Sequence, residues 1–379
     1  MGKITKMKPG ALSTKDIISS LNKASGGVVA YNLNEENPTE VKEWIPTGSR
    51  WLDSIVCKGR LAGIPVGKIS EIAGLEATGK SFMAAQVASN AQKMGCRVAY
   101  FDSESAIDPG FLERAGCNLE ELVYVQAHSV ESVLAMIEDL LKLPEKWLFI
   151  WDSLALTPSE HDLESDYNPQ SSMAMKARVL SKGMPKLVQP IANSGATLLV
   201  LNQLKTNITR SPSEAMTTPY MTPGGKTLPY SYSLRIWLTG RKAKASFVTD
   251  ENGFRIGSEV KCKIEKSRFG STGRMCNFKI LWGDTETIGV QDRESWFDAI
   301  QISENLEQSG AWYALVHEDG TREKFQRAHW LTKLEDEKFQ KRVLHIMDED
   351  VIMKFNDKTG NASDFYDQED QEVPPPTDN

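Results

Sequence analysis

Residues 74 to 81 read Gly74-Leu75-Glu76-Ala77-Thr78-Gly79-Lys80-Ser81, and this octapeptide governs how the rest of the chain is interpreted. It fits G-x-x-x-x-G-K-[ST] and lies between an apolar segment, 68–73, and a helical pattern, 79–94, which is the context that the motif requires. In such a loop the backbone N–H groups point at phosphate oxygens, and the helix N-terminus adds positive potential. We expect Lys80 to reach the β- and γ-phosphates of a nucleotide and Ser81 to bind Mg²⁺; a chance match is the alternative.

Apolar segments of strand length alternate with helical patterns along the chain around this octapeptide. The expected strands are 68–73, 97–102, 122–126, 147–151 and 197–202, and the expected helices are 79–94, 109–115, 130–141 and 172–193. Short apolar strands interleaved with helices of this length indicate an α/β fold with a mostly parallel central sheet covered on both faces. Three later strands, 234–238, 260–265 and 277–282, follow without intervening helices, and we expect them to extend the sheet in antiparallel fashion.

Two of the expected strands end in acidic residues. Asp152 follows the apolar run 148–151, where a carboxylate would hold the water shell of the magnesium ion. Glu104 follows the strand 97–102, which we expect beside the strand of the phosphate-binding loop, and it could orient and deprotonate an attacking water. An acid at a strand end is common, however, and a surface acid that caps the next turn is the alternative for Glu104.

The composition is that of a soluble globular chain. Of 379 residues, 40% are apolar and 25% are charged, and no run approaches the roughly 20 apolar residues of a membrane helix. The five cysteines are odd in number and form no C-x-x-C, which favours free thiols over disulfides or a zinc site. The net charge of −7 argues against nucleic-acid binding, but six negative charges lie in residues 363–379 and leave only −1 on residues 1–362.

Both ends of the chain differ from the middle. Residues 1–44 form a lysine-containing head in which Ser13 or Thr14 could cap a short helix. A helix this short is marginal alone, so we expect it to pack on another subunit, as an oligomerisation segment. Residues 290–355 are expected to form a small α+β domain with helices over 295–308 and 333–347 and a hairpin between them. Residues 356–379 are expected to be a disordered acidic tail.

The motifs together resemble the RecA family of homologous-recombination ATPases, from residue 45 to about residue 330. The phosphate-binding loop carries a glutamate, Glu76, at its third position, as in that family. Glu104, in Phe101-Asp102-Ser103-Glu104, matches the catalytic glutamate, and Phe111 matches the aromatic that stacks on adenine. Asp152 begins a stretch similar to the second nucleotide motif. The resemblance implies a RecA-like P-loop ATPase core over 45–289, with ATP and Mg²⁺ bound by residues of the list Gly74, Glu76, Ala77, Thr78, Gly79, Lys80, Ser81, Phe111 and Asp152.

The resemblance also implies two DNA-binding loops, at about 160–170 and 204–223. Gln203 matches a glutamine that senses the γ-phosphate at the start of the second loop, where cations and apolar groups suit single-stranded DNA; a flexible surface loop is the alternative. The DNA-binding residues that the resemblance implies, in this loop, in the residues that close it and in the segment after the first loop, are Met173, Arg178, Lys205, Ile208, Arg210, Gly224, Gly225 and Lys226. The long second loop departs from the family in holding Pro212, Pro219 and Pro223, and Pro185 stands at a helix position that is basic in bacterial relatives.

A basic segment, 234–281, carries eleven basic residues against four acids. Alternation places Lys261 and Lys263 on one face of the expected strand. By resemblance, a secondary site for duplex DNA would consist of Arg241, Lys242, Lys261 and Lys263. Lys266 and Arg268 would reach across the subunit interface to the ATP of the neighbour, and the order Lys then Arg looks more like the phage UvsX-type branch than the bacterial one.

The implied function is that of a DNA-dependent ATPase that forms helical filaments on single-stranded DNA and catalyses homologous pairing and strand exchange with duplex DNA. Catalysis would depend on Lys80, Glu104, Gln203, Lys266 and Arg268. Single-strand-binding and loading proteins are expected partners, no membrane is involved, and the expected place is the cytoplasm of a bacterium or of a phage host. A ring helicase or motor and a non-catalytic recombination mediator are the alternatives. The acidic tail is either a solubilising end or a competitor that screens the DNA sites.

Overall fold

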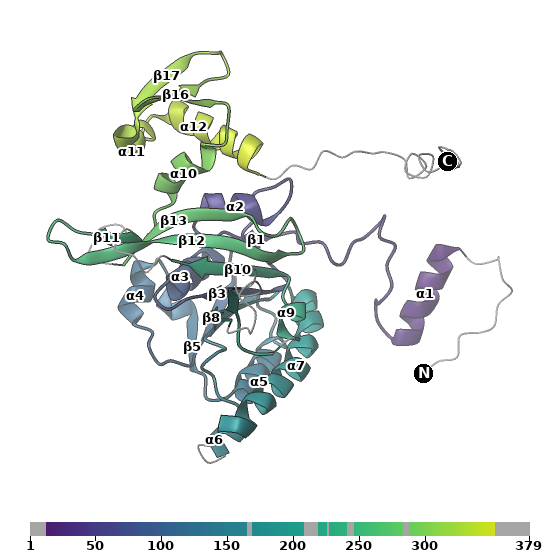
Figure 1. The fold of residues 1–379 in the computed structure, drawn as a ribbon. Coiled ribbons are helices and arrows are strands. Elements are labelled where there is room, and N and C mark those ends of the chain that lie inside the picture. Colours follow the sequence, from purple (N-terminus) through teal and green to yellow (C-terminus); the bar gives the residue numbers. More distant parts are fainter. Residues whose placement is uncertain are drawn as a thin grey trace, which may run out of the picture.

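The protein is described from a computed structural model. The structure describes residues 13–164, 169–207, 219–225, 227–240, 246–282 and 288–352, and for 169–174 only the backbone. Three parts follow one another along the chain: a helix near the N-terminus that lies apart, a core built on one large sheet, and a small C-terminal unit above that sheet (Figure 1).

The core is built on a sheet of ten strands in the described residues, with the order β14-β13-β12-β10-β3-β7-β6-β4-β5 and with β11 paired to β12. Six neighbouring strands, β10 to β5 in that order, run parallel. The others are antiparallel to their neighbours. The bounds are β3 Ile69–Gly74, β4 Arg97–Asp102, β5 Leu122–Gln126, β6 Trp147–Asp152, β7 Thr197–Gln203, β10 Leu234–Thr239, β11 Phe247–Thr249, β12 Arg255–Ser267, β13 Met275–Leu281 and β14 Gly289–Val290.

Helices cover both faces of the sheet, as expected for parallel strands buried on two sides. Alternate strand residues divide between two clusters, with Ile72 and Ile150 facing one side and Phe101 and Phe149 the other. The first cluster is completed by α2 (Arg50–Val56), α3 (Lys80–Lys93) and α4 (Pro109–Arg114), and the second by α5 (Val130–Leu140) and α7 (Pro169–Ser194). Smaller elements are α6 (Glu160–Glu164) and η1 (Leu119–Glu121). The α7 helix continues through Pro185 and Pro190.

Two sequence expectations about the sheet are wrong. The strand predicted at 234–238, β10, pairs parallel with β3 and only its other neighbour, β12, is antiparallel. Two neighbouring strands can run parallel only if a long connection brings the chain back to the end of the sheet where the strands begin. The segment between β7 and β10, which ends in α9 (Leu228–Ser231), is long enough to do so. The strand that precedes Glu104, β4, does not lie beside β3, because β7 and β6 separate them.

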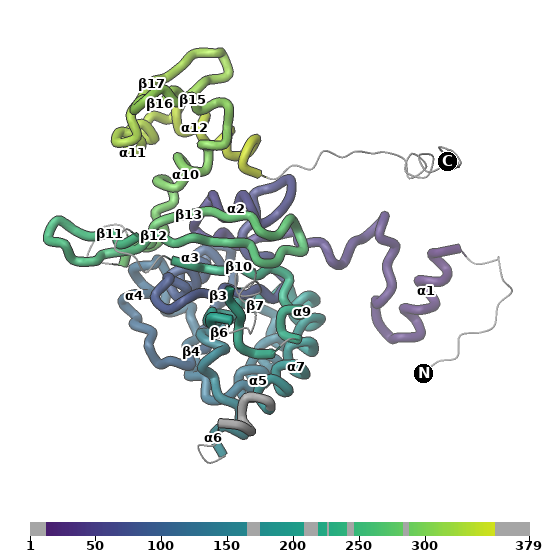
Figure 2. Tube along the Cα trace, in the orientation of Figure 1, coloured from purple at the N-terminus to yellow at the C-terminus, as the bar shows by residue number. Residues whose placement is uncertain are grey.

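The N-terminal helix, α1 (Thr14–Ser25), forms as the sequence predicts. Ser13 is the N-cap and makes a capping box with Asp16, and Gly26 ends the helix at φ +73°. Figures 1 and 2 show α1 apart from the core, joined to it by an extended stretch that reaches β1 (Trp44–Ile45), which pairs with β2 (Ile64–Pro65). Ile17 and Leu21 on α1 are 46% and 40% exposed, so the apolar side of this helix is not covered by the described residues of its own chain.

The C-terminal unit is a three-stranded sheet with helices around an aromatic core. Phe297, Phe325, Trp330 and Phe339 pack edge-on or tilted against one another, with ring centroids 5.2 to 6.3 Å apart. Its elements are α10 (Asp292–Ile300), β15 (Leu306–Ser309), β16 (Trp312–Val316), β17 (Arg322–Gln326), η3 (Arg327–His329), α11 (Trp330–Lys333), α12 (Glu337–Ile346) and the π-helical η4 (Met347–Val351).

The two C-terminal helices are shorter than the sequence predicts, although the hairpin between them, β16 to β17, is confirmed. The helix expected over 295–308 ends at Ile300, because Ser303 accepts the N–H of Asn305 in a polar turn and a strand follows. The helix expected over 333–347 is divided, because Asp336 caps a new helix by accepting the N–H of Phe339.

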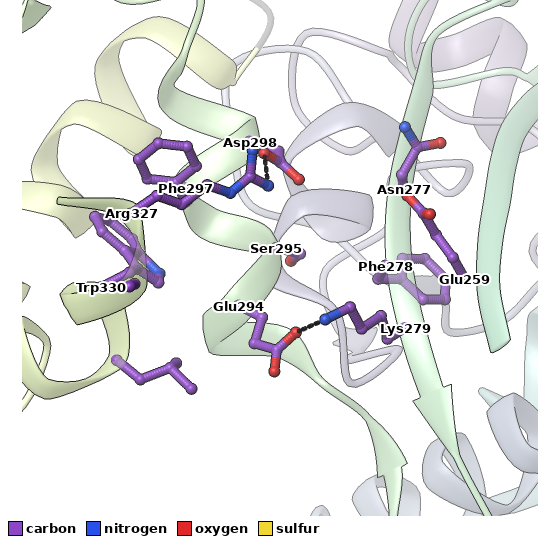
Figure 3. A pocket seen from close by; sticks show the side chains of 12 residues that line it. Glu259, Asn277, Phe278, Lys279, Glu294, Ser295, Phe297, Asp298, Arg327 and Trp330 are labelled. Atoms are coloured by element: carbon purple, nitrogen blue, oxygen red, sulfur yellow. Dashed lines mark hydrogen bonds and ion pairs between the residues drawn. The ribbon is translucent and has the colours of Figure 1, made fainter. Parts of the chain in front are cut away.

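A cavity of about 340 Å³ lies between the sheet and the C-terminal unit, walled by β12, β13, α10 and the segment η3–α11 (Figure 3). Two ion pairs line it: Lys279 with Glu294 at 2.7 Å, and Arg327 with Asp298 at 2.7 Å. The first pair joins β13 to α10, across the junction between the sheet and the C-terminal unit. Among the described residues, no helix combines the length and apolar character needed to cross a membrane.

Candidate nucleotide and DNA site

The phosphate-binding loop leaves the carboxyl end of β3 and enters α3. Ala77 and Gly79 have φ of +54° and +84°, so the backbone turns sharply inside the loop. At this φ glycine is favoured at position 79, and a Cβ there would also lie 2.5 Å from Cδ1 of Ile280, so that the Ile280 side chain would have to move. The N–H of Leu75 donates to the carbonyl of Leu238 in β10 (3.2 Å), which ties the loop to the neighbouring strand. The predicted strand–loop–helix arrangement is present.

Lys80, the first residue of α3, folds back over the loop. Its Nζ donates to the carbonyls of Leu75 (3.0 Å) and Gly74 (3.4 Å). Burial lowers the pKa of Lys80, and the nearby carboxylates of Asp152 and Glu104 oppose that shift. The ammonium group is thus held where a polyphosphate lying in the loop would meet it.

Ser81 and Asp152 face each other across the sheet edge. The Ser81 hydroxyl donates to Oδ2 of Asp152 (2.9 Å), and the buried Tyr100 hydroxyl donates to the same oxygen (2.7 Å). Asp152 is 7% exposed, and this burial raises its pKa. The peptide bond between Asp152 and Ser153 is cis. A hydroxyl beside a buried carboxylate is the hard oxygen donor set that Mg²⁺ prefers, so these two residues fit a magnesium ion.

Glu104 lies on a loop that Asp102 shapes. Asp102 is 2% exposed and accepts the N–H groups of Glu104 (2.8 Å), Ala106 (3.0 Å) and Ile107 (3.2 Å). Ser153 donates its hydroxyl to Oε1 of Glu104 (3.1 Å), so a residue from the end of β6 orients the carboxylate. Glu104 does not cap the turn that follows; Asp102 makes those bonds. Sequence reasoning gave Asp102, Ser153 and Tyr100 no role, although an acid before Ser-x-Ser is a signal for such a side-chain-capped turn.

An aromatic group closes the other side of this site. Phe111, on α4, packs edge-on against Phe82, with centroids 4.5 Å apart, and Phe82 lies 6.3 Å from Trp282. Phe82 directly follows Ser81 and was not singled out in the sequence. A cavity of about 150 Å³ is lined by Ser81, Phe82, Asp102, Glu104, Ala106, Ile107, Phe111 and Asp152. Four residues predicted from separate motifs therefore surround one cavity next to the phosphate-binding loop.

The family model of the RecA N-terminal domain matches residues 13–287. The chain belongs to the RecA family. RecA-family proteins are DNA-dependent ATPases, and the similarity extends over most of this chain, which supports a function in DNA recombination and repair.

Three RecA proteins show the extent of the similarity. Protein RecA of Fusobacterium nucleatum is 29% identical over 314 residues, covering 82% of this chain and 78% of the relative. The Chlamydia felis protein is 28% identical over 296 residues (78% and 80%), and that of Colwellia psychrerythraea 30% over 279 residues (74% and 76%). Each relative is thus matched over about three quarters of its length or more.

The structure describes Gln203 and several of the residues predicted to bind DNA. Gln203 ends β7 directly opposite Gly74. Lys205 is exposed on a two-stranded ribbon, β8 (Lys205–Thr206) with β9 (Tyr220–Met221), and Arg178 is exposed on α7. Gly224 has φ +111°, and a Cβ there would lie 2.5 Å from Leu228, so this glycine lets the segment after the ribbon pack closely.

Part of the predicted DNA surface lies outside the described residues. This applies to Ile208, Arg210, Lys226, Arg241 and Lys242, to most of the second loop, and to residues 356–379. Met173 belongs to α7, but its side chain is not described. Lys261 and Lys263 are on β12, and Lys263 pairs with Glu265 at 2.9 Å, which confirms that alternate residues of this strand share a face.

Lys266 and Arg268 lie at the opposite edge of the sheet from their own phosphate-binding loop. Ser267, between them, is in register with Leu234, which is in register with Ser70 at the start of β3. Four residues of strand separate Ser70 from Gly74, or about 13 Å. Lys266 donates to the carbonyl of Pro229 (2.7 Å) and Arg268 to that of Tyr230 (3.0 Å), both in α9.

Proposed function

We propose that this RecA-family protein polymerises on single-stranded DNA, hydrolyses ATP within the filament, and pairs and exchanges strands with homologous duplex DNA. The observation that carries the proposal is the arrangement of Ser81, Glu104, Phe111 and Asp152 around one cavity beside Lys80, with Gln203 at the adjacent strand end. RecA homologues bind DNA and form filaments, and this arrangement supports an ATPase that responds to DNA.

In the proposed reaction each residue has a role that its position permits. The loop Gly74 to Gly79 and Lys80 bind the phosphates, and Phe111 stacks on the base. A Mg²⁺ ion bound with the nucleotide neutralises charge on the phosphate oxygens, and Ser81 and Asp152 would hold it. Glu104 accepts the proton of the attacking water, and Asp102 and Ser153 keep its carboxylate in place.

The segment that we propose to bind single-stranded DNA begins at Leu204, directly after Gln203. The N–H of Leu204 donates to the carbonyl of Gly74 (3.0 Å), so the first residue of the phosphate-binding loop is bonded to the residue directly before β8, the strand that carries Lys205. We propose that Gln203 reports the γ-phosphate to this ribbon. Contacts to single-stranded DNA then come from Lys205, from Met173 and Arg178 of α7, and from Ile208, Arg210, Gly224, Gly225 and Lys226. Contacts to duplex DNA come from Arg241, Lys242, Lys261 and Lys263.

Hydrolysis depends on assembly in this proposal, because Lys266 and Arg268 serve the site of the neighbouring subunit. Their place at the far edge of the sheet supports action in trans, and such residues are worth about 10³ to 10⁵ in rate. The order Lys266-Ser267-Arg268 further supports membership of the phage UvsX-type branch, with the cytoplasm of the host as the place of action. Residues 1–44 would serve assembly, 45–289 catalysis and 290–355 a separate domain; single-strand-binding and loading proteins would assist.

The test is strand exchange between circular single-stranded DNA and a homologous linear duplex with ATP and Mg²⁺. Joint molecules and nicked circles are expected from the wild type. Lys80→Ala is expected to lose ATP binding or turnover, and Glu104→Ala to keep ATP and DNA binding while turnover falls by at least about 100-fold. Electron microscopy should show open helical filaments on DNA. Closed rings that unwind duplexes without exchange would instead identify a ring motor, and a fully active Glu104→Ala would remove Glu104 from the mechanism.

A further inference from the structure

A buried ion pair lies in the middle of the apolar sheet. Glu71 of β3 and Arg235 of β10 are direct neighbours across the two strands, and Nε of Arg235 donates to Oε2 of Glu71 at 2.6 Å. The Glu71 side chain is 0% exposed and that of Arg235 10%. Burial raises the pKa of Glu71, whereas the charge of Arg235 and a hydrogen bond from Asn202 oppose that shift. Removing two charges from water is costly, so such a pair calls for a reason other than stability.

The first branch of the network leads to the end of β7. Nδ2 of Asn202 donates to Oε1 of Glu71 (2.9 Å) and to the carbonyl of Pro223 (3.2 Å), while Oδ1 of Asn202 accepts the N–H of Gln203 (2.9 Å). Asn202 is 0% exposed. One side chain thus joins the buried carboxylate, the backbone of Gln203 and the segment that follows β9.

The second branch leads to that same segment. A terminal nitrogen of Arg235 donates to the hydroxyl of Thr222 at 3.0 Å. Thr222 directly follows β9 and precedes Pro223, which Asn202 holds by its carbonyl. The network therefore holds the two residues that directly follow the returning strand, Thr222 through its side chain and Pro223 through its backbone carbonyl.

Apolar contacts hold Leu204, which precedes β8, and Tyr220 of β9 on the same face of the sheet. Ala73, Leu204 and Trp237 form a small buried cluster, and Tyr220 of β9 packs against it. Ala73 and Trp237 are two residues beyond Glu71 and Arg235 on their strands, so they share the face of the ion pair. Leu204, just before β8, is bonded to Gly74 at the end of β3, the strand that leads into the phosphate-binding loop. The residues just after β9 are linked to Glu71 of β3 through the side chains of Asn202 and Arg235.

We propose that Glu71, Arg235 and Asn202 are positioning residues that hold the β8–β9 ribbon in a fixed relation to the phosphate-binding loop, so that the nucleotide state changes the affinity for single-stranded DNA. The proposal rests on the proposed function, in which this ribbon carries DNA contacts. Its physical basis is that a buried, fully hydrogen-bonded polar network is stiff and directional, whereas apolar packing alone tolerates sliding. A displacement at Gln203 or Gly74 then moves Lys205 and the ribbon together.

The test removes the hydrogen bond between Arg235 and Thr222 and leaves the ion pair between Glu71 and Arg235 intact. Glu71→Gln would leave a buried guanidinium without its counter-charge and could prevent folding. Thr222→Val keeps the side-chain shape and deletes only the hydroxyl that accepts from Arg235. The readout is the ratio of two dissociation constants for a labelled oligothymidylate, measured with ADP and with a slowly hydrolysed ATP analogue. We expect Thr222→Val to lower this ratio at least about fivefold, and Thr222→Ser to restore it.

The matched control is Thr239→Val on β10, whose hydroxyl donates to the carbonyl of Lys261 (3.4 Å), away from the network. It is expected to keep the wild-type ratio, and all variants should melt at the wild-type temperature. If the wild type itself binds the oligonucleotide equally with both nucleotides, the proposed function fails. If the wild type discriminates and Thr222→Val discriminates equally well, the network has no positioning role and this inference is overturned.

Discussion

Asp102 acts on the nucleotide site through the hydrogen bonds that it accepts. Four donors converge on its carboxylate: three N–H groups of the loop 104–107 and the hydroxyl of Tyr124 (3.1 Å). The loop contains Ser105 at φ +49°, a conformation that few residues other than glycine adopt. The bonds to Asp102 offset this strain and set the direction in which Glu104 leaves the backbone.

Asp102→Asn tests this role. An amide keeps one accepting oxygen but turns an NH₂ group toward donors that now have no acceptor, so the loop that carries Glu104 must shift. We expect ATP turnover to fall about 10- to 100-fold while the affinity for nucleotide stays close to that of the wild type. Single-turnover hydrolysis and fluorescent-nucleotide binding separate the two quantities.

The control for that prediction is Asp108→Asn, at the N-cap of α4. Asp108 accepts the N–H of Phe111 (3.0 Å), and asparagine caps helices as well as aspartate does. This variant is expected to hydrolyse ATP at nearly the wild-type rate. Equal activity of Asp102→Asn and the wild type would mean that Glu104 does not depend on the turn.

Residues within contiguous motifs were predictable, and residues that join motifs were not. The positions of Lys80 and Ser81 at the start of α3 could be predicted because the motif has a fixed spacing between a strand and a helix, and that of Asp152 because it ends an apolar strand. Tyr100 and Ser153 escaped because their roles depend on which strands become neighbours. Glu71 and Arg235, 164 positions apart, look in the sequence like ordinary surface charges, and only the strand order brings them together.

At the scale of elements, the same limit appears in the sheet. The five strands from β3 to β7 were identifiable because each is short, apolar and followed by a helical pattern or a turn. The direction of β10 was not identifiable, because it depends on where the segment between β7 and β10 returns to the sheet. The length of α10 was overestimated for a similar reason, since the polar turn at Ser303 has no strong breaker residue.

Helix α1 has an apolar side that the described part of its own chain leaves open, and we predict that this side mediates assembly. Ile17→Glu should prevent filament formation on single-stranded DNA, because it places a charge on that surface, yet leave the melting temperature of the core unchanged. Ser19→Glu adds the same charge on the other side of the helix and should assemble normally. Electron microscopy and light scattering compare the two variants; equal assembly of both would exclude a role for this side of α1.

At the scale of the whole molecule, the C-terminal unit is joined to the core through Arg50 at the start of α2. Its N–H donates to Asp292 of α10 (2.7 Å), and its guanidinium donates to Asp348 of η4 (2.6 Å). Asp53, one turn further along α2, is 5% exposed and is held by Thr47, whose hydroxyl donates to it at 2.6 Å. Burial raises the pKa of Asp53 to about 7, and the charge of Asp292 raises it further, against the hydrogen bonds of Thr47 and the charge of Arg50.

This pKa gives the junction a defined pH dependence. The folded state binds a proton at Asp53 up to about pH 7, whereas the unfolded chain releases it near 3.8, so the stabilisation is present at acid pH and is lost as the pH rises toward 7. Asp53→Asn removes this dependence. Relative to the wild type, the variant should gain about 2 to 3 kcal/mol in unfolding free energy between pH 5 and pH 8.

Denaturant unfolding at the two pH values measures that gain. Asp336→Asn, at the N-cap of α12, serves as the control and should follow the wild type at both pH values. A constant difference between Asp53→Asn and the wild type would show that Asp53 does not titrate in this range.

Action in trans predicts complementation between inactive subunits. Glu104→Ala lacks the proposed general base but keeps Lys266 and Arg268. The double variant Lys266→Ala with Arg268→Ala keeps Glu104 but lacks the two cations. Each alone should hydrolyse little ATP on DNA. In an equimolar mixture about a quarter of head-to-tail interfaces combine two intact halves, so the mixture should recover about that fraction of wild-type turnover. A mixture no more active than its parts would place Lys266 and Arg268 in their own subunit.

The hydrogen bonds of Lys266 and Arg268 to the α9 carbonyls of Pro229 and Tyr230 have a consequence for the rate of ATP hydrolysis by unassembled protein. In a lone subunit this pair is engaged with its own main chain, and no neighbour supplies another. If the pair acts in trans, as proposed, an assembly of any length leaves one subunit at its end without a neighbour to complete its site. The share of such end subunits falls as the assembly grows, so the rate of phosphate release per subunit would increase with filament length. Unassembled subunits would hydrolyse almost no ATP.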